Sequence, residues 1–383
     1  MPAPNTYSLS ARFKTDEASV INNGTIPTAD TSYLLNSDYF AEFQKLLSQS
    51  TRAGKLYSTD ITSTYSLVYT TTNAYYGGVL APNGDIHFVP STAAVGQKIS
   101  AAGVVSTYSL IHTNVNGAYT GGVLAPNGDI HFVPVLASVG QKISASGVVS
   151  TYSLIYTTSS GPAYNGGVLA PNGDIHFVPR SAPVGQKISA AGVVSTYSLV
   201  YTTATAYGNG VLAPNGDIHF IPTSASVGQK ISAAGIVSTY PLVYTAGSAY
   251  YGGVLAPNGD IHFVPSSSNT PVGQKISAYG VVSTYSLVYT DGGLFNFSGG
   301  VLAPNGDIYF IVDRRGQKIS ASGVVSTYSL AYTANSGNHG GILSPNGDIY
   351  FIPRSGAVGQ RIHSMSANPF SAATCMSPYF NKL

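Results

Sequence analysis

Residues 77–90 read GGVLAPNGDIHFVP, and this segment decides the fold because it recurs along the chain. Its Asn-Gly-Asp-Ile core occurs seven times, at intervals of 41 to 47 residues. The aspartates of the seven copies are Asp85, Asp129, Asp174, Asp217, Asp260, Asp307 and Asp348. A fixed period of this length indicates a repeat architecture, which has to be recognised before single residues are interpreted.

Each repeat is composed of short strand candidates joined by tight turns. Residues 65–69 (YSLVY) place Tyr, Leu and Tyr on one side, which is the period of a strand. Further candidates lie at residues 78–81, 86–89 and 97–100, all too short for helices. Residues 82–84 (PNG) fit a type I turn followed by a left-handed glycine, and they therefore predict a tight hairpin with a bulge.

Four strands in about 44 residues, repeated seven times, predict an all-β protein, a seven-bladed β-propeller spanning residues 54–364. A β-solenoid and an open array of small sheets are the alternatives. Solenoid coils usually need fewer residues, and an open array would expose apolar faces at both ends. The composition agrees, because only 8% of residues are charged and the chain is rich in Gly (43) and Tyr (28), which suits strands and turns.

The sequence does not determine which strand closes the ring. Residues 54–62 align with the stretch that starts at Gln97, so the fourth strand candidate has eight copies and the other three have seven. A seven-bladed ring needs seven of each. Either this extra copy or the final one, residues 360–363, closes the ring or lies outside it.

Outside the repeats, residues 1–53 form a more charged, irregular arm and residues 365–383 form a tail. Ser37 is a candidate N-cap for a short helix near 37–49, with apolar side chains at helical spacing along one side. These side chains are Phe40, Phe43 and Leu47. They either pack on the ring as a plug or dock the arm on another subunit.

Charge and cysteine content exclude several classes of function. The net charge is +2 and the longest basic run is Arg314-Arg315, so we expect no nucleic-acid binding. The single cysteine, Cys375, cannot form an internal disulfide. The first residues lack the apolar stretch of a signal peptide, and no apolar run of 18 residues occurs, so we expect a soluble protein with no membrane partner that does not use the usual secretion route.

Two sets of repeated polar residues could carry chemistry, and both are better explained as structure. One repeat position holds a histidine in five copies: His87, His131, His176, His219 and His262. Equivalent positions on separate blades are usually far apart, so we expect these rings to be hydrogen-bonding side chains between blades and not metal ligands. Each repeat also holds one base in its fourth strand candidate: Lys98, Lys142, Lys187, Lys230, Lys275, Lys318 and Arg361.

Seven near-equal Asp–Lys or Asp–Arg sets are a poor source of the unequal pKa values that acid–base catalysis needs, and exposed pairs of this kind stabilise by only about 0 to 1 kcal/mol. We therefore expect no catalytic residue, no metal and no cofactor, and a protein that is not an enzyme.

The positions at which the copies differ are more informative for function. In an up-and-down meander the two variable stretches of each repeat lie on one side, and the uniform turns lie on the other. Tyr- and Ser-rich loops make good contact surfaces. An aromatic residue recurs two positions before the Gly-Gly in six repeats, either for loop packing or for ligand contact: Tyr75, Tyr119, Tyr164, Tyr207, Tyr250 and Phe297. Aromatic residues without a counterpart in most copies are better binding candidates: Tyr76, Tyr251 and Phe295.

The repeat sequence GGVLAPNGDIHFVP, followed by GQKIS and GVVSTYSLVYT, resembles a family of highly repetitive propeller-type proteins of bacteriophages and large DNA viruses of aquatic hosts. The resemblance covers about 300 of the 383 residues and excludes the N-terminal arm. It implies a virion-structural protein and no defined activity.

We therefore expect a virion structural or attachment component, assembled in the host cytoplasm. Its arm would bind other virion or assembly proteins, and its variable loops would face a glycan or a host-surface receptor. The alternative is a lectin-like propeller with several blade sites, whose weak contacts would add through avidity. A metal-dependent hydrolase in the central channel is a more distant alternative.

Overall fold

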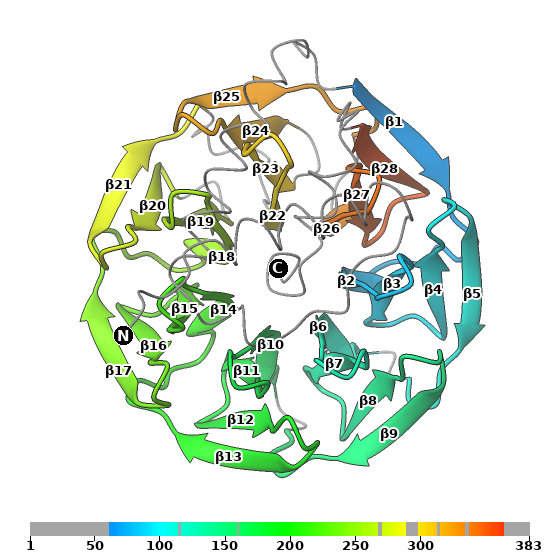
Figure 1. The fold of residues 1–383 in the computed structure, drawn as a ribbon, viewed down its shortest axis with the longest axis horizontal. Helices are drawn as coiled ribbons and strands as arrows, with labels where there is room; N and C mark the ends of the chain where they lie inside the picture. Colours follow the sequence, from blue (N-terminus) through cyan, green and yellow to red (C-terminus); the bar gives the residue numbers. More distant parts are fainter. Residues whose placement is uncertain are drawn as a thin grey trace, which may run out of the picture.

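The computed structural model describes residues 61–113, 116–158, 161–266, 270–288, 298–311, 315–333 and 337–363. In these ranges the chain forms 28 strands in seven four-stranded antiparallel sheets and no helix. Figure 1 shows the sheets arranged as blades around a central axis. The predicted seven-bladed β-propeller is confirmed.

The strands follow one another from the centre of the ring outward. Blades 1 and 2 comprise β2 (Tyr75–Leu80), β3 (Ile86–Pro90), β4 (Val95–Ile99), β5 (Val105–Ser109), β6 (Tyr119–Leu124), β7 (Ile130–Pro134), β8 (Val139–Ile143) and β9 (Val149–Ser153). Blades 3 and 4 comprise β10 (Tyr164–Leu169), β11 (Ile175–Pro179), β12 (Val184–Ile188), β13 (Val194–Ser198), β14 (Tyr207–Leu212), β15 (Ile218–Pro222), β16 (Val227–Ile231) and β17 (Val237–Pro241). Blades 5 and 6 comprise β18 (Tyr250–Leu255), β19 (Ile261–Pro265), β20 (Val272–Ile276), β21 (Val282–Ser286), β22 (Gly299–Leu302), β23 (Ile308–Ile311), β24 (Gly316–Ile319) and β25 (Val325–Tyr328). Blade 7 comprises β26 (Asn338–Leu343), β27 (Ile349–Pro353), β28 (Val358–His363) and β1 (Ile61–Ser66).

The ring is closed by its first strand. β1 pairs antiparallel with β28, from Ile61 opposite His363 to Ser66 opposite Val358. Ser63 Oγ lies 2.7 Å from His363 Nε2, which adds a side-chain contact across the join. Residues 360–363 therefore belong to the ring as part of β28, and the part of the extra copy before residue 61 lies outside the described residues. Each blade also starts one strand later than the repeat as written, because the STYS strand is the outermost strand of the preceding blade.

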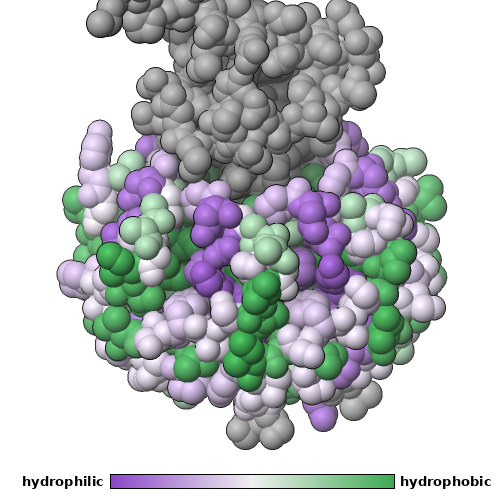
Figure 2. Space-filling model, turned by 60° about the horizontal axis from the view of Figure 1, so that its bottom comes forward, coloured by the Kyte–Doolittle hydropathy of each residue, from purple (hydrophilic) through white to green (hydrophobic). Residues whose placement is uncertain are grey.

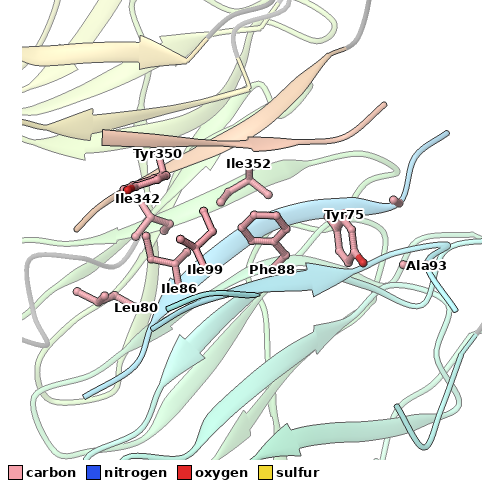
Figure 3. Close-up of a cluster of buried hydrophobic side chains, with 10 residues drawn as sticks. Tyr75, Leu80, Ile86, Phe88, Ala93, Ile99, Ile342, Tyr350 and Ile352 are labelled. Atoms are coloured by element: carbon pink, nitrogen blue, oxygen red, sulfur yellow. The ribbon is translucent and has the colours of Figure 1, made fainter. Parts of the chain in front are cut away.

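Apolar side chains are buried between neighbouring blades. In the cluster of Figure 3, Tyr75 and Phe88 of blade 1 pack edge to face, with ring centroids 5.4 Å apart. Ile342 and Ile352 of blade 7 cover them from the other side. Tyr75 is 1% and Phe88 0% exposed. Because each blade buries one face against the next, the ring needs every blade to complete its core.

The innermost strands approach one another closely, which explains the Gly-Gly of the repeat. A Cβ at Gly121 would lie 3.1 Å from Gly166 Cα of the next blade, and Gly121 has φ +70°. A Cβ at Gly122 would lie 2.6 Å from Val79 Cγ2. A larger residue at either position would push neighbouring blades apart.

The two ends of the strands form different faces of the ring. The Pro-Asn-Gly turns and the Ala-Ala-Gly connections lie on one side, which we call the uniform face. In these turns the Gly84 amide donates to Ala81 O (3.0 Å) and the Asp85 amide to Asn83 Oδ1 (3.0 Å), and Gly84 has φ +84°. The predicted hairpin is thus confirmed. The variable loops, between the second and third strands of a blade and between successive blades, form the variable face.

The connections that lead into the outer strands expose apolar residues at repeated positions. Val104, Val148 and Val193 are each 62% exposed. Figure 2 shows apolar side chains recurring on the described surface, separated by polar ones. The exposed valines therefore repeat with the blades.

The arm (1–53), the helix near 37–49 with Phe40, Phe43 and Leu47, and the tail (365–383) lie outside the described residues. The search for membrane-spanning helices, made over the described ranges, found none of sufficient length and apolar character.

Candidate functional site

The innermost strands bring seven residues of six types to the channel, at the repeat position that precedes Gly-Gly in six blades and Asn-Gly in blade 4. Because these strands begin at the variable face, the position lies at that end of the channel, surrounded by β2, β6, β10, β14, β18, β22 and β26 (Figure 1). The residues are Tyr76, Thr120, Asn165, Gly208, Tyr251, Ser298 and His339. With the glycines that follow, they line one cavity. The glycines, which have no side chain, leave the cavity open, and the larger side chains at the preceding position occupy only parts of it.

The cavity is small, about 40 Å³. One water needs roughly 10 to 15 Å³ measured in this way, so the enclosed part holds a few waters or one small polar group. A larger molecule would place only one group in the cavity and would contact the variable loops with the rest.

Aromatic and polar side chains from distant blades meet across the channel. The imidazole of His339 packs against Tyr76, with ring centroids 4.4 Å apart and planes tilted by 44°, and meets Tyr251 edge to face at 5.2 Å. The Tyr251 hydroxyl donates to Asn165 Oδ1 (3.1 Å), and Asn165 Nδ2 donates to Gly208 O (2.6 Å). Blades 1, 3, 4, 5 and 7 are thereby linked through side chains at one level of the channel.

Two arginines stand above this level on the variable face. The Arg354 guanidinium lies over the Tyr76 ring, 4.7 Å from its centroid, and Arg354 Nε donates to Asn73 Oδ1 (2.7 Å). Arg180 lies in the corresponding loop of blade 3, between β11 and β12. Arg180 holds in blade 3 the position that Arg354 holds in blade 7: its carbonyl accepts the Ala206 amide of the next blade (2.8 Å), as the Arg354 carbonyl accepts the Ala74 amide (2.9 Å).

His339 is a neutral imidazole in this setting. Burial, reinforced by Arg354 and more weakly by Arg180, lowers the pKa of His339 to about 3. Its side chain is buried, and no hydrogen-bond partner for Nδ1 is found in the described part of the chain. The Thr223 hydroxyl, which lies beside Gly208, is also buried without a partner among the described residues. The site therefore contains polar atoms whose hydrogen bonds are not satisfied by the ring itself.

The charges of the repeat lie near the opposite face. Lys98 Nζ is 2.7 Å from Asp85 Oδ2, whose other oxygen accepts the Ala101 amide (3.2 Å). All seven aspartates of the described ranges are paired in this way: Lys98–Asp85, Lys142–Asp129, Lys187–Asp174, Lys230–Asp217, Lys275–Asp260, Lys318–Asp307 and Arg361–Asp348. The variable face consequently shows arginines and, within the described ranges, no carboxylate.

The repeated histidines pack within their own blade, so the expectation of a hydrogen bond between blades is wrong. His87 meets Tyr108 of the outer strand edge to face at 5.4 Å, and the Tyr108 ring crosses over Gly96, where a Cβ would collide with it. Burial lowers the pKa of His87 to about 4. A hydrogen bond is present in blade 4, between His219 Nδ1 and Tyr240 Oη (3.3 Å). In the described ranges no three His, Cys, Asp or Glu residues are grouped so as to hold a metal.

The structure separates the aromatic binding candidates into two groups. The recurring tyrosines of blades 1 to 5 are buried: Tyr75, Tyr119, Tyr164, Tyr207 and Tyr250. Each donates its hydroxyl to a valine carbonyl of its own blade, as Tyr75 does to Val95 O (3.0 Å). These five rings are therefore packed inside their own blades and offer no exposed aromatic surface. Phe295 and Phe297 lie outside the described residues.

Tyr76 and Tyr251, selected because most copies lack them, do lie together in the channel. Sequence reasoning missed His339, Asn165, Arg180 and Arg354. Their signal was available in principle, since each departs from the repeat at a position where the topology brings the blades together.

No family model matches the chain, and no curated protein matches it. Solved structures do. A streptogramin B lyase shares 19% identity over 79% of this chain and 97% of its own, with a TM-score of 0.68. A catalytically inactive histidine-to-alanine variant of virginiamycin B lyase from Staphylococcus aureus, with quinupristin, shares 15% over 80% of this chain and 100% of its own, with a TM-score of 0.65. The extracellular domain of a putative one-component system from B. thetaiotaomicron shares 8%, with a TM-score of 0.58, over 78% of this chain and 39% of its own.

At these identities the likeness shows the fold alone. The expectation that the protein is not an enzyme is corrected to this extent: the structures of similar fold include a streptogramin B lyase and a virginiamycin B lyase, so the fold gives no ground for excluding catalysis. Near-equal repeated charges do not argue against catalysis when the channel carries a separate, unlike set of side chains. The matches lend no support to a viral structural role.

Proposed function

We propose that the protein binds a ligand at the variable-face end of its central channel. The supporting observation is the diversification of one position on the innermost strand. Blade 1 has Tyr76 there and blade 7 has His339, whereas the following residues are Gly-Gly-Val-Leu and Gly-Gly-Ile-Leu. If the side chain at this position served only to fill the channel, the same residue type could occur in all seven blades. The variety of residue types therefore favours a role in binding.

The geometry favours one central site over seven sites on separate blades. The aromatic ring that every one of blades 1 to 5 possesses is sealed in the core, so equivalent blade sites have no common aromatic surface to offer. By contrast, Tyr76 and Tyr251 are half-buried and reach the cavity from different blades. A sugar or an aromatic group could stack on them while the surrounding loops contact the rest of the ligand.

A glycan array and a thermal-shift screen of small molecules, both on the full chain, test this proposal. The variant Tyr76→Ala/Tyr251→Ala should lose the binding found with the native chain. Tyr279→Ala is the matched control, because Tyr279 is 95% exposed in a turn of the uniform face, and it should bind normally. Equal binding by the native chain and the double variant would refute the site.

Catalysis at the same cavity is a second candidate, and His339 is the observation that favours it. Its Nδ1 is buried, and the ring is held by two tyrosines, as a positioned proton acceptor would be. With a pKa near 3 it is a weak base, so a substrate would have to raise that pKa by bringing negative charge toward the arginines. Incubation with quinupristin tests the nearest analogy: a product seen with the native chain and missing with His339→Ala would support it, and unchanged quinupristin would oppose it.

The expected virion attachment role is kept as a proposal that is compatible with ligand binding by the variable face. In it, the arm fixes the ring to a particle and the channel end faces outward. Proteomics of purified particles and co-assembly of a chain lacking residues 1–53 test it. The truncated chain should keep any ligand binding and lose assembly, and its normal incorporation would place the anchor elsewhere.

A further inference from the structure

The variable-face end of the channel has a positive charge that the rest of the ring does not balance. Every carboxylate of the described ranges belongs to a pair near the uniform face. Arg180 and Arg354 stand outside those pairs, in loops of the variable face, and Arg315 lies in a third such loop. A mouth lined by cations over an apolar, low-dielectric ring attracts anions.

Two of the three arginines are directed at the cavity and keep donors available. Arg354 uses Nε for Asn73, and its terminal nitrogens have no partner in the described ranges. The Arg180 side chain makes neither a hydrogen bond nor an ion pair with the described residues, and both arginines are half-buried. Each acts electrostatically on Tyr76 and on His339, although they come from blades 3 and 7. Arg354 lies over Tyr76, which lines the cavity, and Arg180 occupies the equivalent position of blade 3, so the two arginines approach the channel end from different sides of the ring.

The cavity between them suits a compact group. Its volume of about 40 Å³ admits one group of a few heavy atoms. Carboxylate, phosphate and sulfate are of this size, and planar guanidinium groups donate to them in pairs. The Thr223 hydroxyl, at the equivalent loop position of blade 4, supplies an uncharged polar atom without a partner among the described residues.

We propose that Arg180 and Arg354 bind an oxyanion group, a carboxylate, phosphate or sulfate, at the mouth of the channel. This inference rests on the proposed function and assigns the chemical class of the ligand's group that enters the cavity. The anion is either free or carried by a larger molecule such as an acidic sugar, and both present the same oxygens to the arginines.

Calorimetric titration of the full chain with sodium sulfate, phosphate and acetate, at ionic strength held constant with chloride, tests the inference. At least one of them should bind saturably. Arg180→Gln and Arg354→Gln should each weaken binding by about tenfold or more, the loss typical of a charge-assisted hydrogen bond, and Arg354→Lys should restore part of it. Arg315→Gln is the matched control, because Arg315 lies in the same loop of blade 6 but does not act on His339 or Tyr76, and it should bind as the native chain does.

Glucose 6-sulfate and glucose 6-phosphate, with glucose as the neutral reference, distinguish the two sources of the anion. Tighter binding of the sugar esters than of the free ions points to an anionic group on a larger ligand, and equal binding points to the free ion. Absence of saturable binding by every oxyanion and ester, or equal binding by both glutamine variants, overturns the inference. If a neutral ligand still binds and is lost in Tyr76→Ala/Tyr251→Ala, the proposed function stands and the anion assignment alone fails.

Discussion

The second to fourth strands keep nearly the same residues from blade to blade, whereas the first strand varies at the position that faces the channel. In blades 1 to 5 the outer three strands repeat one set of contacts: a buried histidine against a tyrosine, and an Asp–Lys pair near the uniform face. The first strand changes its channel residue from Tyr76 to Thr120 to Asn165 in consecutive blades. The difference teaches that the repeated set maintains the ring, while the channel position is free to acquire function. Substitutions in the two regions should therefore separate stability from binding.

Acidification should have the largest effect, and it should act on the repeated set. Burial lowers the pKa values of five histidines to about 4 from 6.5: His87, His131, His176, His219 and His262. Between pH 6.5 and pH 4 these histidines bind protons in the unfolded chain and not in the folded one. The free energy of unfolding therefore has its full value above pH 6.5 and falls as the pH drops toward 4. Each histidine would account for about 3 kcal/mol of that loss. Urea unfolding at pH 7, 5.5 and 4 measures it.

His87→Tyr sharpens this test, because tyrosine is the native residue at that position in blades 6 and 7. The variant should reduce the contribution of the histidines to the slope of stability against pH by about one sixth, since it removes one of six histidines whose pKa burial lowers, the five repeated ones and His339. A stability that does not change between pH 7 and 4 would contradict the assignment of these rings as neutral and buried.

Removing a core ring should have the next largest effect. Phe132 is 0% exposed and packs beside Tyr119, so Phe132→Ala should lower the free energy of unfolding by about 3 to 5 kcal/mol. Thr120→Ala, on the channel strand of the same blade, should cost about 1 kcal/mol or less. Chemical denaturation of both variants compares them, and similar losses would break the distinction between the two regions.

A smaller loss is expected from a repeated ion pair. Burial opposes ionisation of Asp129, but Lys142 and the Ala145 amide hold its pKa below the usual value. Asp129→Asn should therefore cost about 1 to 2 kcal/mol, because it weakens both the ion pair and the contact with the amide. Lys142→Met should cost less than about 1 kcal/mol, since the lysine is partly solvated. If Lys142→Met lowered the stability in thermal unfolding more than Asp129→Asn does, the Lys142–Asp129 ion pair would supply the stability, and not the contact of Asp129 with the Ala145 amide.

The smallest effect on stability is expected in the channel. Tyr251→Phe removes the hydrogen bond to Asn165 and keeps the ring, so it should cost about 1 kcal/mol at neutral pH. Ligand binding should change more than stability does, because the phenol helps to position the Asn165 amide. Calorimetry and denaturation of the same sample give both quantities, and a large loss of stability with unchanged binding would assign Tyr251 to the core.

The repeat was sufficient to predict the blades, since its strand pattern and hairpin turn depend on local sequence. It could not fix where one blade ends, because the STYS strand is equally compatible with either neighbour until pairing is seen. Nor could it show that Tyr75 is sealed inside the blade while Tyr76, the next residue, faces the channel. A bulge shifts the register between Tyr75 and Gly78, so strict alternation does not hold there. His339 was missed because its relation to Tyr76 and Tyr251 arises only when three blades meet.

The pairing of β1 with β28 also sets an order of events during synthesis. Ser63 and its partner His363 are 300 residues apart, so at about 5 to 20 residues per second the ribosome needs roughly 15 to 60 s to supply the second after the first. Blades 1 to 6 can form from contiguous chain as they emerge, whereas blade 7 must recruit a strand made long before. Throughout that interval β1 presents an unpaired backbone edge, which a nascent neighbour on the same message could capture to give a ring shared between two chains.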